Sequence, residues 1–205
     1  FPNPRNCSKC VCPGGYGGDH CNERPKGDCG RTIEASPEWN TLTDILGDVS
    51  VLKPLQDFTV CNYWINSPPE TEIEIILLSF SNSFDVDGCV YDGVEIKANQ
   101  DQRLSGYRFC SRNAAGTTLR SYTNRVPVIT WNRLYRSEMS LLYRYVSSSE
   151  PRPAARTIRP LPNHGKTTTE LPLPADFETS GGAVPFPDDF WTTGEAARQC
   201  VDHPE

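Results

Sequence analysis

Cysteine is the residue type that offers this chain the most chemistry, because nine cysteines and a single methionine occur among 205 residues. The cysteines form a dense group at the start, a spread group in the middle and one isolated position: Cys7, Cys10, Cys12 and Cys21; Cys29, Cys61, Cys89 and Cys110; and Cys200. Such a density is typical of proteins outside the cytosol, where disulfides persist. We therefore expect a secreted, extracellular, disulfide-stabilised protein.

A structural zinc site is the alternative use of these thiolates. Zinc sites of this kind pair two C-x2-C units, or combine one such unit with two closely spaced histidines. Cys7 and Cys10 have the first spacing, but the other cysteines do not repeat it, and His20, His164 and His203 are scattered. The pattern favours disulfides over zinc.

The scarcity of histidine also limits catalysis. A zinc protease of the extended H-E-x-x-H type needs three histidines at fixed spacing, and a serine or cysteine nucleophile needs a nearby histidine base. His20 lies in a short glycine-rich segment, whereas His164 and His203 lie in a proline-rich region with no core to hold them. We expect no catalytic residues in this chain.

Charge and hydropathy exclude two further classes of partner. The net charge of −6 provides no basic surface for nucleic acid. The longest apolar run, at 75–78, is far too short to span a bilayer and reads as a buried strand.

The elements that must position these cysteines are strands in the middle of the chain. Alternating β-branched, aromatic and polar residues predict strands at 58–65, 72–80, 90–96, 126–131 and 139–146. Residues 38–46 could instead form one helical turn, confined by Pro37 and Gly47. Several short strands separated by turn signals indicate an all-β sandwich or barrel.

The two ends of the chain have a different composition. Residues 1–21 are polar and glycine-rich, so disulfides must supply their stability. Residues 22–28 read as a linker, and residues 147–205 are rich in proline, threonine and serine, which predicts a disordered tail. Phe186, Phe190 and Trp191 could form a docking motif in that tail, although scattered aromatic residues are the favoured interpretation.

The first cysteine group resembles part of an EGF-like module. Cys10, Cys12 and Cys21 follow a C-x-C-x8-C pattern with a glycine-rich hairpin before the last cysteine. The resemblance implies a Cys12–Cys21 bridge and a truncated module over residues 1–21. Cys7 and Cys10 would then have partners upstream of Phe1, so the chain is expected to be a fragment.

The second cysteine group resembles a CUB domain. The matching elements are Cys29-Gly30, Cys61-x2-Trp64, Cys89-Val90-Tyr91-Asp92 and Gly106-Tyr107-Arg108-Phe109-Cys110. The resemblance implies bridges Cys29–Cys61 and Cys89–Cys110 and a CUB-type, jelly-roll-like antiparallel β-sandwich over residues 29–146. With the EGF-like end before it, and with Ser121-x2-Asn124-x-Val126-Pro127-Val128 and Tyr143-Arg144 after, the order resembles the C-terminal half of a nematode-type astacin zinc metalloprotease.

The CUB resemblance also implies a calcium site at Asp87 and Asp92. Calcium needs six or more oxygen ligands, yet Asn132 and Arg133 occupy the region where the third acid is expected. An arginine beside a cation is unfavourable, so two solvated acids are the favoured interpretation.

Two short motifs suggest surface functions. Asn6 begins an N-glycosylation sequon. Lys26-Gly27-Asp28 resembles an integrin-recognition tripeptide, although a chance match within an ordinary linker is the favoured interpretation.

We therefore predict a non-catalytic recognition region of an astacin-family metalloendopeptidase, which docks an extracellular protein substrate or matrix protein. Catalytic zinc would lie in a domain upstream, and this chain would need no cofactor of its own. One alternative is a secreted adhesion or structural protein with no protease domain, and another is a calcium-dependent binding module. The partner, the oligomeric state and the role of Cys200 stay open.

Overall fold

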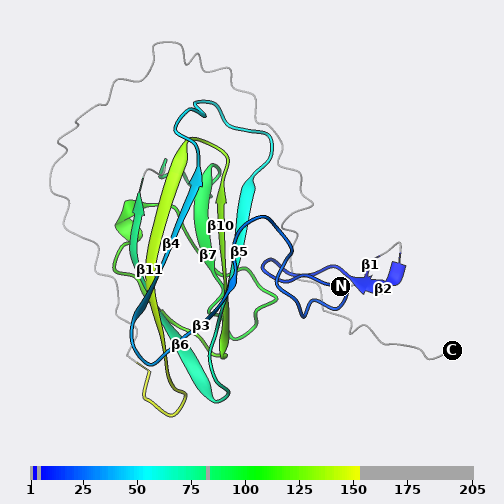
Figure 1. The fold of residues 1–205 in the computed structure, drawn as a ribbon, viewed down its shortest axis with the longest axis vertical. Helices are drawn as coiled ribbons and strands as arrows, with labels where there is room; N and C mark the ends of the chain where they lie inside the picture. Colours follow the sequence, from blue (N-terminus) through cyan, green and yellow to red (C-terminus); the bar gives the residue numbers. More distant parts are fainter. Residues whose placement is uncertain (1, 4–5, 82–83, 153–205) are drawn as a thin grey trace. The chain divides into compact units, whose positions relative to one another are not determined.

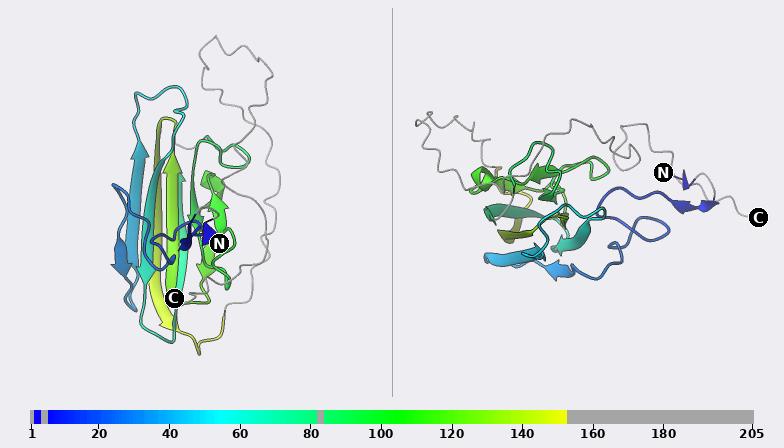
Figure 2. Two further views of the ribbon diagram at one scale, coloured as in Figure 1. Left: turned by 90° about the vertical axis from the view of Figure 1, so that its right-hand side faces the viewer. Right: turned by 90° about the horizontal axis from the view of Figure 1, so that it is seen from above.

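Two β-sheets packed face to face contain most of the regular structure (Figures 1 and 2). The computed structural model describes residues 2–3, 6–81 and 84–152, with side chains for residues 11–80 and 84–152. Ten strands and one short 3₁₀ helix follow the two-residue strand β1 (Pro2–Asn3) in this part of the chain. They are β2 (Asn6–Cys10), β3 (Thr32–Glu34), β4 (Asn40–Gly47), β5 (Thr59–Asn66), β6 (Thr71–Ser81), β7 (Asp92–Ile96), β8 (Tyr107–Phe109), η1 (Arg112–Ala114), β9 (Thr118–Arg120), β10 (Arg125–Asn132) and β11 (Arg136–Ser147).

The sandwich has one sheet of five strands and one of four. The five-stranded sheet has the order β3-β5-β10-β7-β8, and the four-stranded sheet has the order β4-β11-β6-β9. All neighbouring strands are antiparallel except β3 and β5, which run parallel. The prediction of an all-β sandwich is confirmed, and the five predicted strands correspond to β5, β6, β7, β10 and β11.

The core lies between the sheets and draws on both. In β11 every second residue from Ser137 to Tyr143 is buried, which is the period expected of a strand with one face toward a core. These residues meet the inward side chains of the opposite sheet, such as Val94, Val126 and Val128.

No helix long and apolar enough to cross a membrane occurs among the described residues.

The helical alternative for residues 38–46 is wrong, because Asn40–Gly47 forms β4 and pairs with β11. Leu42 and Leu46 point into the core from this strand. The strand ends at Gly47, whose φ of +81° is a conformation that glycine adopts without strain. A Cβ there would lie 1.9 Å from the carbonyl oxygen of Tyr135, so no other residue fits the turn.

Three disulfides stabilise the described part of the chain, and they join the pairs that the EGF-like and CUB resemblances imply: Cys12–Cys21, Cys29–Cys61 and Cys89–Cys110. Their Cα–Cα distances are 5.2, 5.0 and 5.5 Å. By the loop-closure estimate, each of the two bridges of the sandwich contributes about 3–4 kcal/mol. The side chains of Asn6, Cys7, Cys10 and Cys200 lie outside the described residues, as does the predicted tail beyond residue 152.

Candidate functional site

The outer face of the five-stranded sheet carries a docked loop, residues 13–18, which we call the glycine-rich loop. Gly15 lies against β10, and a Cβ at this position would come within 2.9 Å of Pro127 and 3.3 Å of Ile129. On the neighbouring strand β5, the indole nitrogen of Trp64 donates a 2.7 Å hydrogen bond to the carbonyl oxygen of Gly15. The loop closed by Cys12–Cys21 therefore packs directly on the sandwich.

A buried lysine forms a second tie to the same loop. Lys97 is 1% exposed, and its ammonium group donates a 3.0 Å hydrogen bond to the carbonyl oxygen of Gly14. Burial lowers the pKa of Lys97, while the carboxylates of Glu95 and Asp101 act in the opposite direction. A buried charge requires such partners, so the loop supplies part of the environment that holds Lys97.

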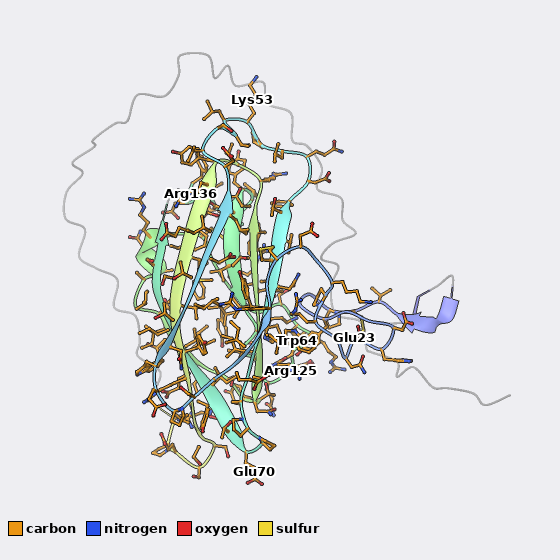
Figure 3. All side chains as sticks on the ribbon, viewed as in Figure 1. Glu23, Lys53, Trp64, Glu70, Arg125 and Arg136 are labelled. Carbon is orange, nitrogen blue, oxygen red and sulfur yellow. A yellow bond between two sulfur atoms is a disulfide. The ribbon has the colours of Figure 1, made fainter. Side chains whose placement is uncertain are left out.

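Aromatic and guanidinium groups complete this junction. The ring centroids of Tyr16 and Trp64 are 5.5 Å apart, and the guanidinium carbon of Arg125 lies 4.0 Å from the centroid of the Trp64 ring. The Tyr16 hydroxyl also donates a hydrogen bond to Gln102, and burial raises the pKa of this tyrosine. Figure 3 shows Trp64 and Arg125 beside the segment that carries Glu23. Stacking and hydrogen bonds together fix the orientation of the loop on the sheet.

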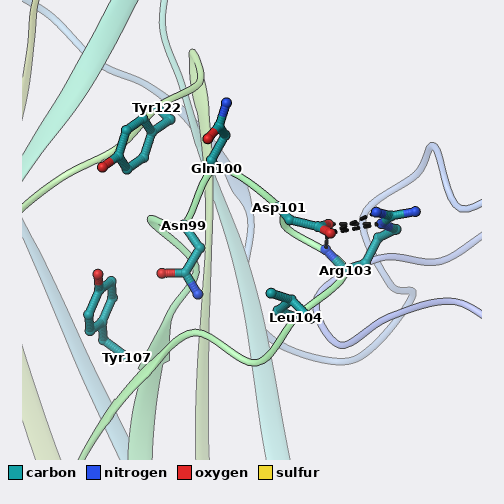
Figure 4. A pocket seen from close by; sticks show the side chains of 7 residues that line it. All are labelled: Asn99, Gln100, Asp101, Arg103, Leu104, Tyr107 and Tyr122. Atoms are coloured by element: carbon teal, nitrogen blue, oxygen red, sulfur yellow. Dashed lines mark hydrogen bonds and ion pairs between the residues drawn. The ribbon is translucent and has the colours of Figure 1, made fainter. Parts of the chain in front are cut away.

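Two shallow hollows adjoin this junction and share Gln100. The first, which we call the junction hollow, has a volume of about 460 Å³ and combines Tyr16 of the loop with residues of the sandwich: Gln100, Gln102, Thr123, Asn124 and Arg125. The second, which we call the tyrosine hollow, has a volume of about 660 Å³ and is lined by Asn99, Gln100, Asp101, Arg103, Leu104, Tyr107 and Tyr122 (Figure 4).

The expectation that Asp87 and Asp92 are both solvated is wrong for Asp92, which is 2% exposed, and holds for Asp87. Asp92 is buried in β7, and this burial raises its pKa to about 7, opposed by a hydrogen bond from the Phe84 backbone. Its Oδ2 atom has no hydrogen-bond partner among the described residues. Asp87 is exposed in the preceding loop.

The residues at the expected position of a third ligand, Asn132 and Arg133, make other contacts. The Arg133 guanidinium lies 4.8 Å from the ring centroid of Phe58 and 5.7 Å from that of Tyr91, and the Asn132 side chain bonds Leu134. Within the described ranges, no three His, Cys, Asp or Glu side chains gather as metal ligands. Calcium binding at Asp87 and Asp92 stays a prediction.

The junction was missed by sequence reasoning, which used Trp64 only as part of a motif and did not consider Gly15 or Lys97. One signal was present, because Lys97 interrupts the apolar run around Ile96 and Ala98. A lysine in such a run is buried only when something accepts its charge. Lys26, Gly27 and Asp28 lie exposed in the linker, as does His20 before it.

The chain is similar in sequence to zinc metalloproteinases. No family model matches the chain. It is 45% identical over 150 residues to zinc metalloproteinase nas-31 of Caenorhabditis elegans, covering 73% of this chain and 24% of that protein. It is 37% identical over 152 residues to zinc metalloproteinase nas-32 of the same species, covering 73% and 23%. The chain thus spans about a quarter of the length of these curated relatives.

Solved structures of CUB domains are also similar, at lower sequence identity than these relatives. The CUB1-EGF-CUB2 structure of human MASP-1/3 aligns with a TM-score of 0.39 and 18% identity, over 67% of this chain and 50% of that one.

Proposed function

Because the chain is homologous to a region of the C. elegans astacin zinc metalloproteinases and folds as a CUB-type β-sandwich, we propose that it is the recognition region of a secreted zinc metalloendopeptidase. In this role it docks a protein substrate or matrix protein, while a separate domain of the parent protein holds the catalytic zinc. The three disulfides support an extracellular location, since such bonds persist outside the cytosol.

The fixed junction is the observation that carries this proposal. A recognition module raises the effective concentration of substrate at a catalytic site most strongly when its connection holds the two sites at a suitable distance. Here the hydrogen bonds from Trp64 and Lys97 and the packing of Gly15 hold the glycine-rich loop against the sheet. An EGF-like module ending in this loop would therefore orient the sandwich relative to whatever precedes it.

Comparing cleavage of two substrates by two forms of the parent protein tests the proposal. We expect removal of the sandwich to lower kcat/KM for a folded protein substrate by about tenfold or more, and to leave kcat/KM for a short peptide unchanged. An equal loss on both substrates would indicate damage to the catalytic domain. Unchanged cleavage of every protein substrate would contradict the docking role.

The matched variants for this experiment are Trp64→Phe and Leu52→Ala in the intact parent protein. Trp64→Phe removes the hydrogen bond to Gly15 but keeps an aromatic ring, so it loosens the junction with little loss of packing. We expect it to lower protein cleavage selectively. Leu52 is exposed in the loop between β4 and β5 and lines neither hollow, so its substitution should change neither activity.

The alternative function is adhesion or structural support without a protease domain. It is favoured by the exposure of Lys26, Gly27 and Asp28, the integrin-like tripeptide, in the linker. The sequence of the parent protein upstream of this region decides between the two, because an extended zinc-binding histidine motif there supports the protease. Loss of cell adhesion on Asp28→Ala would support the alternative.

A further inference from the structure

We propose that the tyrosine hollow binds a neutral glycan. This inference deepens the proposed recognition function and rests on it, because the docked partner would then be a glycoprotein or a matrix polysaccharide. The hollow is lined by the loop between β7 and β8, by Tyr107 at the start of β8, and by the segment between β9 and β10 (Figure 4).

Two tyrosine rings form one side of the hollow. Tyr107 and Tyr122 are 46% and 53% exposed, so neither ring serves the core. In Figure 4 both rings lie on the same side of Asn99 and Gln100, with Leu104 on the other side. One face of a sugar ring consists of C–H groups, and such a face packs on an aromatic ring while the hydroxyls stay hydrated. Tyrosine suits this contact because its body is apolar and its tip is polar.

The ring of Tyr122 is held in place before any ligand arrives. The guanidinium carbon of Arg152 lies 3.7 Å from the centroid of this ring. Arg152 is itself fixed by 2.7 Å hydrogen bonds to a carboxylate oxygen of Glu72 and to the carbonyl oxygen of Ser121. A ring ordered in this way loses little conformational entropy when a ligand stacks on it.

Amide side chains supply the polar contacts between the rings and Leu104. The Asn99 amide donates to the carbonyl oxygen of Ser105 at 2.9 Å, and Gln100 makes no side-chain hydrogen bond within the described part of the chain. An amide presents both donors and an acceptor in one plane. It can therefore pair with two neighbouring hydroxyls of a sugar, each of which donates and accepts.

The charges of the hollow cancel, which argues for a neutral ligand. The Arg103 guanidinium donates hydrogen bonds to the Asp101 carboxylate, 2.8 Å long from Nε and 2.7 Å long from Nη2. This pairing lowers the pKa of Asp101 to about 2. No net positive charge is left to attract sulfate or phosphate. An apolar peptide anchor would need a closed hydrophobic pocket, whereas Leu104 is the one aliphatic side chain that lines this open hollow.

The test measures the binding of defined oligosaccharides to the full 205-residue chain. Isothermal titration gives the affinity, and changes in NMR chemical shifts give the residues that the ligand affects. The probes are mannotetraose, cellotetraose, chitotetraose and an asialo N-glycan as neutral ligands, a heparin tetrasaccharide as an anionic ligand, and a mixture of aromatic hexapeptides. We expect at least one neutral probe to bind. We expect neither heparin nor the peptides to bind at the same positions.

Variants of the hollow locate the site. Tyr122→Ala should weaken binding by about tenfold, while Tyr122→Phe should keep it within about twofold because the stacking face remains. Gln100 is exposed, so Gln100→Ala cannot unfold the chain and should weaken binding about threefold. Leu52→Ala is the control and should leave the affinity unchanged.

Three outcomes would overturn the proposal: binding by none of the neutral probes, neutral binding that Tyr122→Ala does not affect, or heparin or peptide binding that Tyr122→Ala abolishes. The measurement involves no protease, so its failure leaves the cleavage comparison intact. Conversely, glycan binding without any effect of the sandwich on cleavage would refute the docking role alone.

Discussion

In the five-stranded sheet the outer face of β10 is buried, with Pro127 and Ile129 under the glycine-rich loop and Trp131 beside the Arg108 guanidinium. The outer face of β11 in the four-stranded sheet stays partly accessible. Every residue of β10 after Arg125 is buried, although only alternate residues can face the core. In β11 buried and half-buried residues alternate. The burial pattern therefore shows that β10 is covered on both faces, and an apolar run alone does not show this, because the run at 75–78 of β6 in the four-stranded sheet leaves Leu78 43% exposed.

The charges of the two sheets follow the same division. Asp92, Glu95 and Lys97 are buried in and just after β7 of the covered sheet. On the four-stranded sheet, Glu74 and Glu72 form ion pairs with arginines, at 2.8 Å to Arg144 and 2.6 Å to Arg120. Both sheets therefore bury carboxylates, but Asp92 of the covered sheet has an Oδ2 atom without a hydrogen-bond partner among the described residues and Glu95 has a long ion pair, at 3.8 Å to Arg108. The ion pairs of the four-stranded sheet are closer.

The largest expected effect comes from replacing Trp64 on β5, and it is compared with the replacement of Trp39, which lies directly before β4 of the four-stranded sheet. Trp64 is 5% exposed beneath the loop, and Trp39 is 39% exposed beside Arg144. We expect Trp64→Ala to lower the free energy of unfolding by about 3–5 kcal/mol, and Trp39→Ala by about 1 kcal/mol or less. Urea denaturation measures both, and equal losses would show that the loop does not cover its sheet in solution.

The second test uses the buried carboxyl of the covered sheet. Because burial raises the pKa of Asp92 to about 7, the folded state binds its proton more tightly than the unfolded state. The stability of the protein should therefore fall as pH rises from about 4 to about 7. Asp92→Asn should remove this dependence and raise the free energy of unfolding by about 2–4 kcal/mol at pH 8, with little change at pH 4.

The exposed Asp87→Asn is the control for that measurement and should keep the wild-type pH profile. A calcium-dependent rise in the Tm of the wild type, absent in both variants, would instead favour the calcium site. Isothermal titration with Ca²⁺ provides an independent reading.

The third test separates backbone strain from contact at two glycines. Gly15 and Gly116 have φ angles of +81° and +85°, but a Cβ would contact Pro127 at Gly15 and nothing within 4 Å at Gly116. Gly116→Ala should cost about 1 kcal/mol of strain, and Gly15→Ala should cost about 1–2 kcal/mol more because the loop must move. Faster hydrogen exchange of residues 13–18 in Gly15→Ala alone would support the junction, and equal costs would count against it.

The smallest effect is expected on the open sheet. A double-mutant cycle on Glu74 and Arg144 should give a coupling free energy of about 0.5–1 kcal/mol, since the arginine is partly hydrated. A coupling of several kcal/mol would mean that this face is covered as well, and would remove the distinction between the sheets.

Most of the sandwich could be predicted from the sequence because its long strands are rich in β-branched and aromatic residues and are separated by turn signals. The ambiguity at β4 has a physical cause, since Leu42 and Leu46 are four residues apart and that spacing fits both a strand and a helix. The three-residue strands β3, β8 and β9 are too short to show any period.

The junction could not be predicted, because its parts are brought together only by the fold. Gly15, Trp64 and Lys97 belong to three separate segments, and nothing in their local sequence pairs them. The tyrosine hollow has the same origin, since Tyr107 begins strand β8 and Tyr122 lies in the connection between β9 and β10. Sequence patterns identify elements, whereas the surfaces between elements depend on tertiary packing.

The contact between Gly15 and β10 sets a limit on how this protein can be recombined. Cutting the chain at Cys29, where the sandwich begins by its disulfide pattern, would expose Pro127, Ile129 and Trp64 to water and deprive Lys97 of its acceptor. A sandwich cut from the chain at Cys29 should aggregate. A sandwich transferred into another protein should need the glycine-rich loop to be transferred with it. The stable folding unit therefore includes the glycine-rich loop and begins before Cys29, although the disulfide pattern of the sandwich begins at Cys29.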